Sequence, residues 1–295
     1  MVRGRLLEGE PMSRHTSLRV GGPARMMLLA RDVDDVVAAT SWAREEDWPC
    51  LVIGLGTNLL VSDQGFPGLV VKTHPGLGQT VWEEESVRVE AGSSLASLAR
   101  EAIGRGRAGL EFAVGIPGTV GGALVGNAGA HGHSLGELVL EAEVLTDQGE
   151  RRTWPPGKLE FGYRTSSLQR LAAVVLSVRL RLGHEERDRL RARAEEFLRR
   201  RRRSQPLGQP SAGCVFRNPP GRSAGELLDR CGLKGMKRGG AEVSSVHANF
   251  IINRGGATAA DVLELMRRMR EAVCQRFGVL LEPEVRTVGF EEPVW

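Results

Sequence analysis

The stretch "EFAVGIPGTVGGALVGNAGAHG", residues 111–132, decides the fold. Six glycines fall between positions 115 and 129 of this stretch: Gly115, Gly118, Gly121, Gly122, Gly126 and Gly129. Because each glycine loses much conformational freedom in a regular element, this density predicts neither a stable helix nor a stable strand. Intervening side chains such as Ile116 and Val120 are too apolar for a solvated linker. We therefore expect exposed backbone that lies against a cofactor.

A second glycine loop, "GLGTNLLV" at residues 54–61, directly follows the apolar strand expected at 49–54. Missing side chains at Gly54 and Gly56 let backbone N–H groups approach phosphate oxygens. The loop is not the dinucleotide fingerprint G-x-G-x-x-G, because Leu59 takes the third glycine's place and no amphipathic helix follows. Taken alone it could be an ordinary strand-to-loop turn. Two such loops without a Rossmann helix favour one long cofactor, FAD.

The periodicity of the apolar residues predicts strands and helices in three sections. Strands are expected at 24–30, 49–54, 68–73, 86–92, 140–146, 172–183 and 247–253, with an extended segment at 279–290. Helices are expected at 32–47, 93–106, 184–203, 222–232 and 258–278. The last has Thr258 and Asp261 in capping-box spacing and stops at Gly278. The two long strands of the middle section predict a mainly antiparallel sheet.

Composition excludes several classes of protein. The 295 residues carry a net charge of +4, and no apolar run approaches the roughly 20 residues of a membrane helix. The first residues lack the apolar core of a signal peptide, so a cytoplasmic enzyme is expected. The four cysteines, Cys50, Cys214, Cys231 and Cys274, form neither a C-x-x-C pair nor a group with histidines. We therefore expect free thiols and no metal site.

The sequence resembles the UDP-N-acetylenolpyruvoylglucosamine reductase family in six stretches that occur in the family's order over nearly the whole chain. They are "HTSLRVGGPA" (15–24), "GLGTNLLV" (54–61), "GIPGTVGGALVGNAGAHG" (115–132), "YRTS" (163–166), "SAGCVFRNP" (211–219) and "LEPEVR" (281–286). The resemblance implies an α+β chain: a two-lobed FAD-binding fold of the vanillyl-alcohol-oxidase/PCMH type followed by a smaller α+β substrate-binding domain. The implied FAD-binding subdomains are 1–72, to which the tail 285–295 could return, and 73–183. A linking helix at 184–204 would lead to the substrate-binding domain at 205–284.

The resemblance also implies an activity. Family members are flavoproteins of peptidoglycan precursor synthesis, and they reduce UDP-N-acetylglucosamine enolpyruvate to UDP-N-acetylmuramate with bound FAD and NADPH. In this family NADPH enters the substrate site, reduces the flavin and leaves. No separate nicotinamide fold is then needed. The expected partner is a UDP-sugar small molecule, with neither nucleic acid nor membrane. The sequence does not disclose the oligomeric state, and a monomer is compatible with it.

Three residues match the family's catalytic positions. Cys214 stands where most members carry the proton-donating serine; a thiol, with an ordinary pKa of about 8.5, is a better acid than an alcohol. Arg164 matches the catalytic arginine, which could hold the substrate carboxylate. Glu284 matches the catalytic glutamate, and a raised pKa would let it donate to the developing enolate. In an extended "LLEPEVR", Glu284 and Glu282 share one face, so Glu282 is the fallback.

The binding residues follow from the same match. The residues expected to bind FAD are Gly54, Leu55, Gly56, Thr57, Asn58, Leu59, Gly115, Ile116, Pro117, Gly118, Thr119, Gly121, Gly122, Asn127 and Ala128. Asn218 matches a position that binds the nucleotide-sugar. Tyr163, Arg217 and Arg286 are expected at the substrate, with Arg203 as a further candidate for the diphosphate. The short spacing between Arg164 and Cys214 resembles the branch of the family that lacks a tyrosine-bearing lid.

Two other functions remain open at this point. One is an FAD-dependent oxidase or dehydrogenase with the same FAD fold and a different substrate; "SAGCVFRNP" together with "LEPEVR" argues against it. The other is a nucleic-acid-binding protein that uses "RRRRRS" (199–204) to neutralise phosphates. Glutamates such as Glu195 and Glu196 interrupt the basic residues, and no aromatic stacking surface accompanies them, so a solvated helix face is favoured.

Overall fold

A computed structural model describes residues 2–171, 173–291 and 294. The chain forms two compact units. The first comprises Met1–Leu7, Met26–Leu55 and Gly68–Arg201, and the second comprises Glu8–Arg25, Gly56–Pro67 and Arg202–Trp295. Strands β1 (Arg5–Pro11), β2 (Pro23–Leu29) and β5 (Phe66–Lys72) contribute residues to both. Of the tail expected to return to the first subdomain, Glu292, Pro293 and Trp295 lie outside the described residues.

Helix α1 (Val33–Glu45) opens the helical part of the first unit. Its N-cap, Asp32, accepts the backbone N–H of Asp35 at 3.0 Å, which satisfies a donor that the helix leaves unpaired. Strand β3 (Cys50–Ile53) then runs parallel to β5 at the end of a sheet with the order β1-β2-β5-β3. Buried Leu28, Val36 and Val71 belong to one apolar cluster here. The elements predicted at 24–30, 32–47, 49–54 and 68–73 are confirmed.

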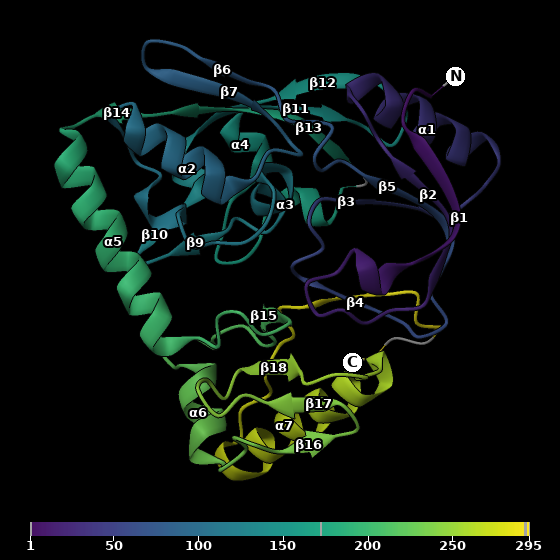
Figure 1. Ribbon diagram of the computed structural model, residues 1–295, viewed down its shortest axis with the longest axis vertical. Coiled ribbons are helices and arrows are strands. Elements are labelled where there is room, and N and C mark those ends of the chain that lie inside the picture. Colours follow the sequence, from purple (N-terminus) through teal and green to yellow (C-terminus); the bar gives the residue numbers. More distant parts are fainter. Residues whose placement is uncertain (1, 172, 292–293, 295) are drawn as a thin grey trace. The chain divides into compact units, whose positions relative to one another are not determined.

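A five-stranded antiparallel sheet follows, with the order β12-β11-β13-β7-β6. Its strands are β6 (Thr80–Trp82), β7 (Ser86–Glu90), β11 (Val139–Leu145), β12 (Arg151–Trp154) and β13 (Val174–Arg181). Helices α2 (Leu95–Gly104), α3 (Val120–Val125) and α4 (Pro156–Leu159) lie beside this sheet (Figure 1). Their buried side chains belong to the same apolar core as those of the sheet. The predicted antiparallel sheet is confirmed; the first residue of the strand expected at 172–183, Ala172, lies outside the described residues.

Helix α3 corrects the prediction that the glycine tract holds no regular element. Thr119 caps it by accepting the N–H of Gly122 at 3.3 Å, and Val120 and Leu124 are fully buried. A Cβ at Gly121 would lie 2.8 Å from the Cβ of Ala91, so glycine allows the helix to approach the end of β7. Burial of the two apolar side chains offsets the roughly 0.5–1 kcal/mol that each helical glycine costs.

Helix α5 (Arg187–Ser204), expected from the sequence at 184–203, carries an apolar stripe. Leu190 and Ala194 are buried, and Phe197 is partly buried in the same core. Arg193 donates to the buried carboxylate of Glu111 at 2.6 Å. The remaining elements of the first unit are short: β8 (Arg107–Ala108), β9 (Gly129–Ala130), β10 (His133–Ser134), β14 (Gly183–His184), and the 3-10 helices η2 (Glu111–Ala113), η3 (Leu135–Leu138) and η4 (Ser167–Gln169).

The second unit holds an antiparallel sheet with the order β15-β18-β17-β16. Its strands are β15 (Ser211–Cys214), β16 (Lys237–Arg238), β17 (Ala241–Val243) and β18 (Phe250–Asn253). Helix α7 (Ala259–Phe277) contacts β17 and β16, and α6 (Ala224–Arg230) contacts α7 (Figure 1). Strand β4 (Leu59–Val61) pairs in parallel with β19 (Arg286–Val288), and η1 spans Met12–Arg14.

The predicted ends of α7 are confirmed. Thr258 and Asp261 form the capping box, and Gly278 ends the helix in the left-handed conformation with φ of 65°. Asp63, outside the helix, accepts the N–H groups of Ala259 and Ala260 at 2.7 and 3.0 Å.

Candidate active site

Cys214 is the last residue of β15, opposite Phe250 of β18. The pairing slips between Ser211 and Cys214, and Gly213 has a left-handed φ of 80° within this irregular stretch. Side chains rarely adopt that conformation, so glycine at 213 permits the kink that leads into Cys214. The cysteine is partly exposed. None of the four cysteines forms a disulfide among the described residues.

The backbone after Cys214 runs beside the segment that carries Glu284. The N–H of Glu284 donates to the carbonyl of Val215 at 2.8 Å, and the N–H of Arg217 donates to the carbonyl of Glu282 at 2.9 Å. An antiparallel bridge between Phe216 and Pro283 lies between these two bonds. Two of the predicted catalytic residues therefore lie on neighbouring extended segments of one unit.

The expected alternation along residues 281–286 is present except at Pro283, which is partly exposed like Glu284. Leu281 and Val285 are buried, whereas Glu282 and Arg286 are exposed and Glu284 is partly exposed. The side chain of Glu282 is 79% exposed, and its carboxylate lies 4.0 Å from the Arg217 guanidinium. Partial burial distinguishes Glu284 from the fallback residue Glu282.

The 54–61 loop contributes Asn58 to the same place. Its side-chain amide donates to the carbonyl of Glu284 at 2.9 Å, and its own carbonyl accepts the N–H of Arg286 at 3.0 Å. Gly56 has φ of 61°, and a Cβ there would lie 2.1 Å from the carbonyl oxygen of His15. This close approach and the left-handed φ require glycine at position 56.

Arg164 lies in the first unit, against the glycine tract. Its Nη1 donates to the carbonyl of Gly129 at 2.9 Å, and its backbone has a left-handed φ of 56°. The Tyr163 ring centre lies 5.5 Å from the Arg164 Cζ, and Tyr163 is 56% exposed. A left-handed arginine is uncommon and costs about 1 kcal/mol or more, and such strain often marks functional sites.

Hydrogen bonds of Asn127 hold the glycine tract, residues 111–132, in place. Buried Asn127 donates to the carbonyl of Gly162 at 2.8 Å and accepts the N–H of Gly136 at 2.9 Å. Gly54 approaches Thr119 so closely that a Cβ would lie 2.2 Å from the threonine Oγ1.

A buried polar atom beside the tract tests whether a cofactor would fit. Within the described residues the Oγ of Ser93 is buried without a hydrogen-bond partner, while the Ser93 carbonyl accepts the N–H of Val120. Buried hydroxyls are ordinarily paired. An orphaned hydroxyl next to close-packed glycines fits a polar cofactor such as FAD.

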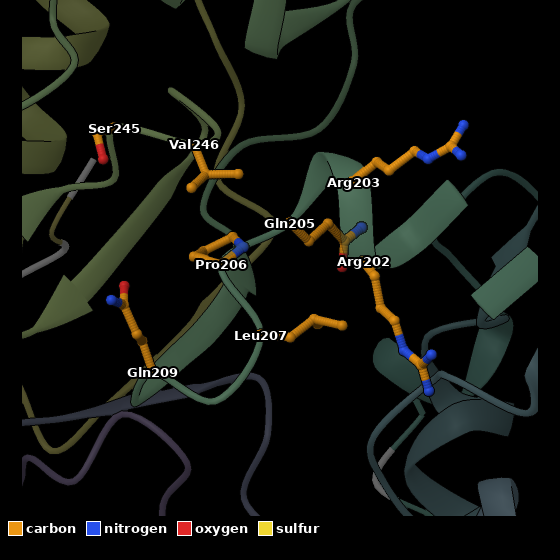
Figure 2. Close-up of a pocket in the computed structure, with 8 residues that line it drawn as sticks. All are labelled: Arg202, Arg203, Gln205, Pro206, Leu207, Gln209, Ser245 and Val246. Atoms are coloured by element: carbon orange, nitrogen blue, oxygen red, sulfur yellow. The ribbon is translucent and has the colours of Figure 1, made fainter. Parts of the chain in front are cut away.

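A pocket of about 360 Å³ opens in the second unit (Figure 2). Its lining consists of Arg202, Arg203, Gln205, Pro206, Leu207, Gln209, Ser245 and Val246. Leu207 and Val246 are about half exposed, and the Oε1 of Gln205 is buried without a partner in the part of the chain that the structure describes. Apolar surface beside two arginines suits an anionic organic ligand. Arg203 is the diphosphate candidate named from the sequence.

Asn218, which stands at a predicted substrate position, also contacts the first turn of α6, whose N-cap is Ser223. The Oδ1 of Asn218 accepts the N–H of Ala224, the first residue of α6, at 2.9 Å. This contact fixes the side-chain carbonyl.

Two family models match this chain. One, described as the C-terminal domain of UDP-N-acetylenolpyruvoylglucosamine reductase, matches residues 205–288, and one described as an FAD binding domain matches residues 24–154. The reductase of Gloeobacter violaceus is 48% identical over 291 residues, which cover 98% of each chain. The reductase of Moorella thermoacetica is 47% identical over 284 residues, covering 96% of this chain and 93% of that one.

This chain belongs to the UDP-N-acetylenolpyruvoylglucosamine reductase family.

A solved structure agrees with this membership. The crystal structure of the reductase of Thermus caldophilus superposes with a TM-score of 0.84 at 36% identity, covering 98% of this chain and all of that one. The predicted family, the α+β class and the FAD-binding fold are thereby confirmed. The individual site residues of this reductase family member remain predictions.

Other observations bear on partners of this reductase family member. Among the described residues, no three or more His, Cys, Asp and Glu side chains are grouped to hold a metal ion. The helices of residues 2–171 and 173–291 are all too short or too polar to cross a bilayer.

Sequence reasoning missed Asn249, which is 1% exposed and hydrogen-bonds the backbone next to Cys214. The sequence contains one hint of its role: Asn249 is a polar residue inside the apolar strand expected at 247–253.

Proposed function

We propose that this chain catalyses the NADPH-dependent reduction of UDP-N-acetylglucosamine enolpyruvate to UDP-N-acetylmuramate, a step of peptidoglycan precursor synthesis in the cytoplasm. The adjacency of Cys214 and Glu284 in the second unit carries the proposal, because reduction of this alkene needs a proton donor beside a group that stabilises an enolate. The residues that match the family's C-terminal domain, 205–288, include both.

FAD would be held by the two glycine loops, within the subdomains proposed at 1–72 and 73–183. The contacts of Gly54 with Thr119, and the orphaned Ser93 hydroxyl, support this placement for the first unit. Asn58 supports a role for the 54–61 loop near Glu284. When bound, the flavin supplies the hydride that the terminal alkene carbon accepts.

The protein's own residues stabilise the negative charge of the enolate and supply the proton. Cys214 donates its thiol proton to the carbon next to the carboxylate, and the thiolate is reprotonated before the next turnover. Arg164 holds the substrate carboxylate, where negative charge builds as the enolate forms. Glu284, in its protonated form, donates a hydrogen bond to the enolate oxygen.

The UDP-sugar would be bound by the proposed domain at 205–284. Asn218, Arg217 and Arg286 are the proposed contacts to the nucleotide-sugar, with Tyr163 at the reacting end. The arginine-lined pocket in which Arg203 lies supports a diphosphate there, since a guanidinium pairs well with phosphate oxygens.

An absorbance experiment tests the proposal. The purified protein should bind FAD and be yellow, should bleach with NADPH in the absence of oxygen, and should recover its colour when the enolpyruvyl nucleotide is added. Protein with no affinity for FAD would contradict the proposal. Bleaching without recovery by the nucleotide would favour the alternative, an FAD-dependent oxidase or dehydrogenase with another substrate.

A further inference from the structure

One buried residue, Asn249, binds three of the four backbone polar groups of the two residues after Cys214. Val215 and Phe216 present four backbone polar groups. The carbonyl of Asn249 accepts the N–H of Val215 at 2.9 Å; its side-chain Oδ1 accepts the N–H of Phe216 at 3.0 Å, and its Nδ2 donates to the carbonyl of Phe216 at 2.8 Å. The fourth group, the carbonyl of Val215, accepts the N–H of Glu284.

This arrangement joins both proposed catalytic residues to Asn249. Cys214 precedes the segment that Asn249 holds, and Glu284 is bonded to its other side at 2.8 Å. Val215, Phe216 and Asn249 are each no more than 2% exposed, so water does not replace a lost bond there. A shift of the 215–216 peptide would move Cys214 and Glu284 relative to each other.

The backbone of Asn249 is itself held in place by His247. Its backbone N–H donates to the Nδ1 of His247 at 3.2 Å, and the His247 ring packs edge-on against Phe250 with a centroid distance of 5.0 Å. A Cβ at Gly225 would lie 2.7 Å from the His247 ring, so α6 closes over it tightly. Asn249 thus sits in a rigid environment, as a residue that sets geometry must.

We propose that Asn249 is a positioning residue that sets the separation of the Cys214 thiol and the Glu284 carboxyl during proton transfer to the substrate. The inference rests on the proposed function. It assigns Asn249 no contact with substrate or flavin.

Asn249→Asp tests the proposal with the smallest change of shape. One carboxylate oxygen can still accept the Phe216 N–H, but the other faces the Phe216 carbonyl and repels it unless it is protonated. Burial favours the protonated form of the carboxyl group that Asn249→Asp introduces. That form donates a hydrogen bond to the Phe216 carbonyl, as the Asn249 amide does. The variant should therefore be impaired at high pH and recover as the pH falls.

Measuring flavin reduction and flavin reoxidation separately distinguishes a loss of positioning from a general loss of structure. In the flavin-loaded variant, reduction by NADPH should stay within about twofold of wild type, because it needs no proton from Cys214. Reoxidation by the enolpyruvyl nucleotide should be about 10- to 100-fold slower than wild type near pH 8, as expected for a misplacement of about 1 Å. The ratio to wild type should rise toward 1 as the pH is lowered to about 6.

Asn253→Asp is the matched control. Asn253 is the last residue of β18, the strand that begins directly after Asn249. Its Nδ2 donates to the Leu18 carbonyl at 3.1 Å and its Oδ1 accepts the Gly255 N–H at 2.8 Å, and neither bond reaches residues 215–216. Its reoxidation rate should match wild type at every pH. If Asn249→Asp does not fold, Asn249→Ser, which is uncharged, should show the slower reoxidation without the recovery at low pH.

Four results would overturn the inference. The first two are unchanged reoxidation in folded Asn249 variants and equal loss of both half-reactions. The other two are an Asn249→Asp deficit that does not shrink at low pH and a deficit of the same size in Asn253→Asp. Wild-type protein that the nucleotide fails to reoxidise would instead defeat the proposed function. The two failures are therefore distinguishable.

Discussion

Replacing Gly54 with alanine should destabilise the first unit and weaken FAD binding. The added Cβ would lie 2.2 Å from the Oγ1, 2.6 Å from the Cγ2 and 2.9 Å from the Cβ of Thr119. Rotation about χ1 of Thr119 can place its single Cβ hydrogen at only one of the two close positions, and it leaves the Cβ contact unchanged, so the backbone must move. Overpacking of this kind costs about 1–3 kcal/mol, and loss of the Thr119 cap on α3 adds about 1 kcal/mol.

We expect Gly54→Ala to lower the free energy of unfolding, measured with urea at fixed FAD, by about 2–4 kcal/mol. Because both residues are proposed to bind FAD, the same shift should weaken FAD binding at least about tenfold, which corresponds to roughly 1.4 kcal/mol. Flavin fluorescence during titration measures this affinity. Gly157→Ala is the control: Gly157 is exposed in α4 with nothing within 4 Å of an added Cβ.

A double-variant cycle decides whether the clash is the cause. Thr119→Ala removes the Oγ1 and Cγ2 that Gly54→Ala would meet, so the combined variant should lose at least about 1 kcal/mol less than the sum of the single variants. Additive losses would refute the contact argument. So would a Gly54→Ala protein as stable as Gly157→Ala.

Other consequences concern the ion pair of α5 and the histidine beside Asn249. Arg193→Met removes the ion-pair partner of the Glu111 carboxylate, which is 4% exposed and keeps the N–H of Gly109, and it also breaks the pair of Arg193 with Glu185. It should therefore lower the free energy of unfolding by about 2 kcal/mol, whereas Arg191→Met, which breaks an exposed pair with Asp188, should change it by less than about 0.5 kcal/mol. Equal losses in urea unfolding would contradict this reasoning. Burial lowers the pKa of His247, with neighbouring Lys234 adding to the effect and Asp229 opposing it. Because the unfolded chain then binds more protons, stability should fall as the pH drops below the ordinary histidine pKa of about 6.5, and this fall should be shallower in His247→Asn. An unchanged pH profile of unfolding in that variant would contradict the assignment.

Local signals were enough to predict α7 completely. Its capping box, its apolar stripe and its terminal glycine all lie within one continuous segment, so no distant contact is needed to recognise them. The same holds for α1, whose cap Asp32 immediately precedes it.

Helix α3 could not be predicted in this way. Its sequence carries two adjacent glycines, and their cost is offset by Val120 and Leu124 in a core built from distant strands and by the close approach to Ala91. Only the tertiary packing shows that Gly121 is needed for the close contact with Ala91.

The candidate site shows the same limit. Family resemblance named Cys214, Arg164 and Glu284, but no periodicity indicates that Glu284 pairs with Val215 or that Asn58 bonds the Glu284 carbonyl across 226 positions. Asn249 was missed because its partner Phe216 is 33 positions away. Such bonds depend on the register between segments, which the sequence of either segment does not contain.

Stopped-flow measurement of both half-reactions in Cys214→Ala and Cys214→Ser tests the proton-donor role most directly. In Cys214→Ala, flavin reduction by NADPH should stay within about twofold of wild type, while reoxidation by the enolpyruvyl nucleotide should slow by about 10²–10⁴, the usual contribution of a general acid. Cys214→Ser should retain substantial reoxidation. Reoxidation at the wild-type rate in Cys214→Ala, or an equal loss of both half-reactions, would contradict the account.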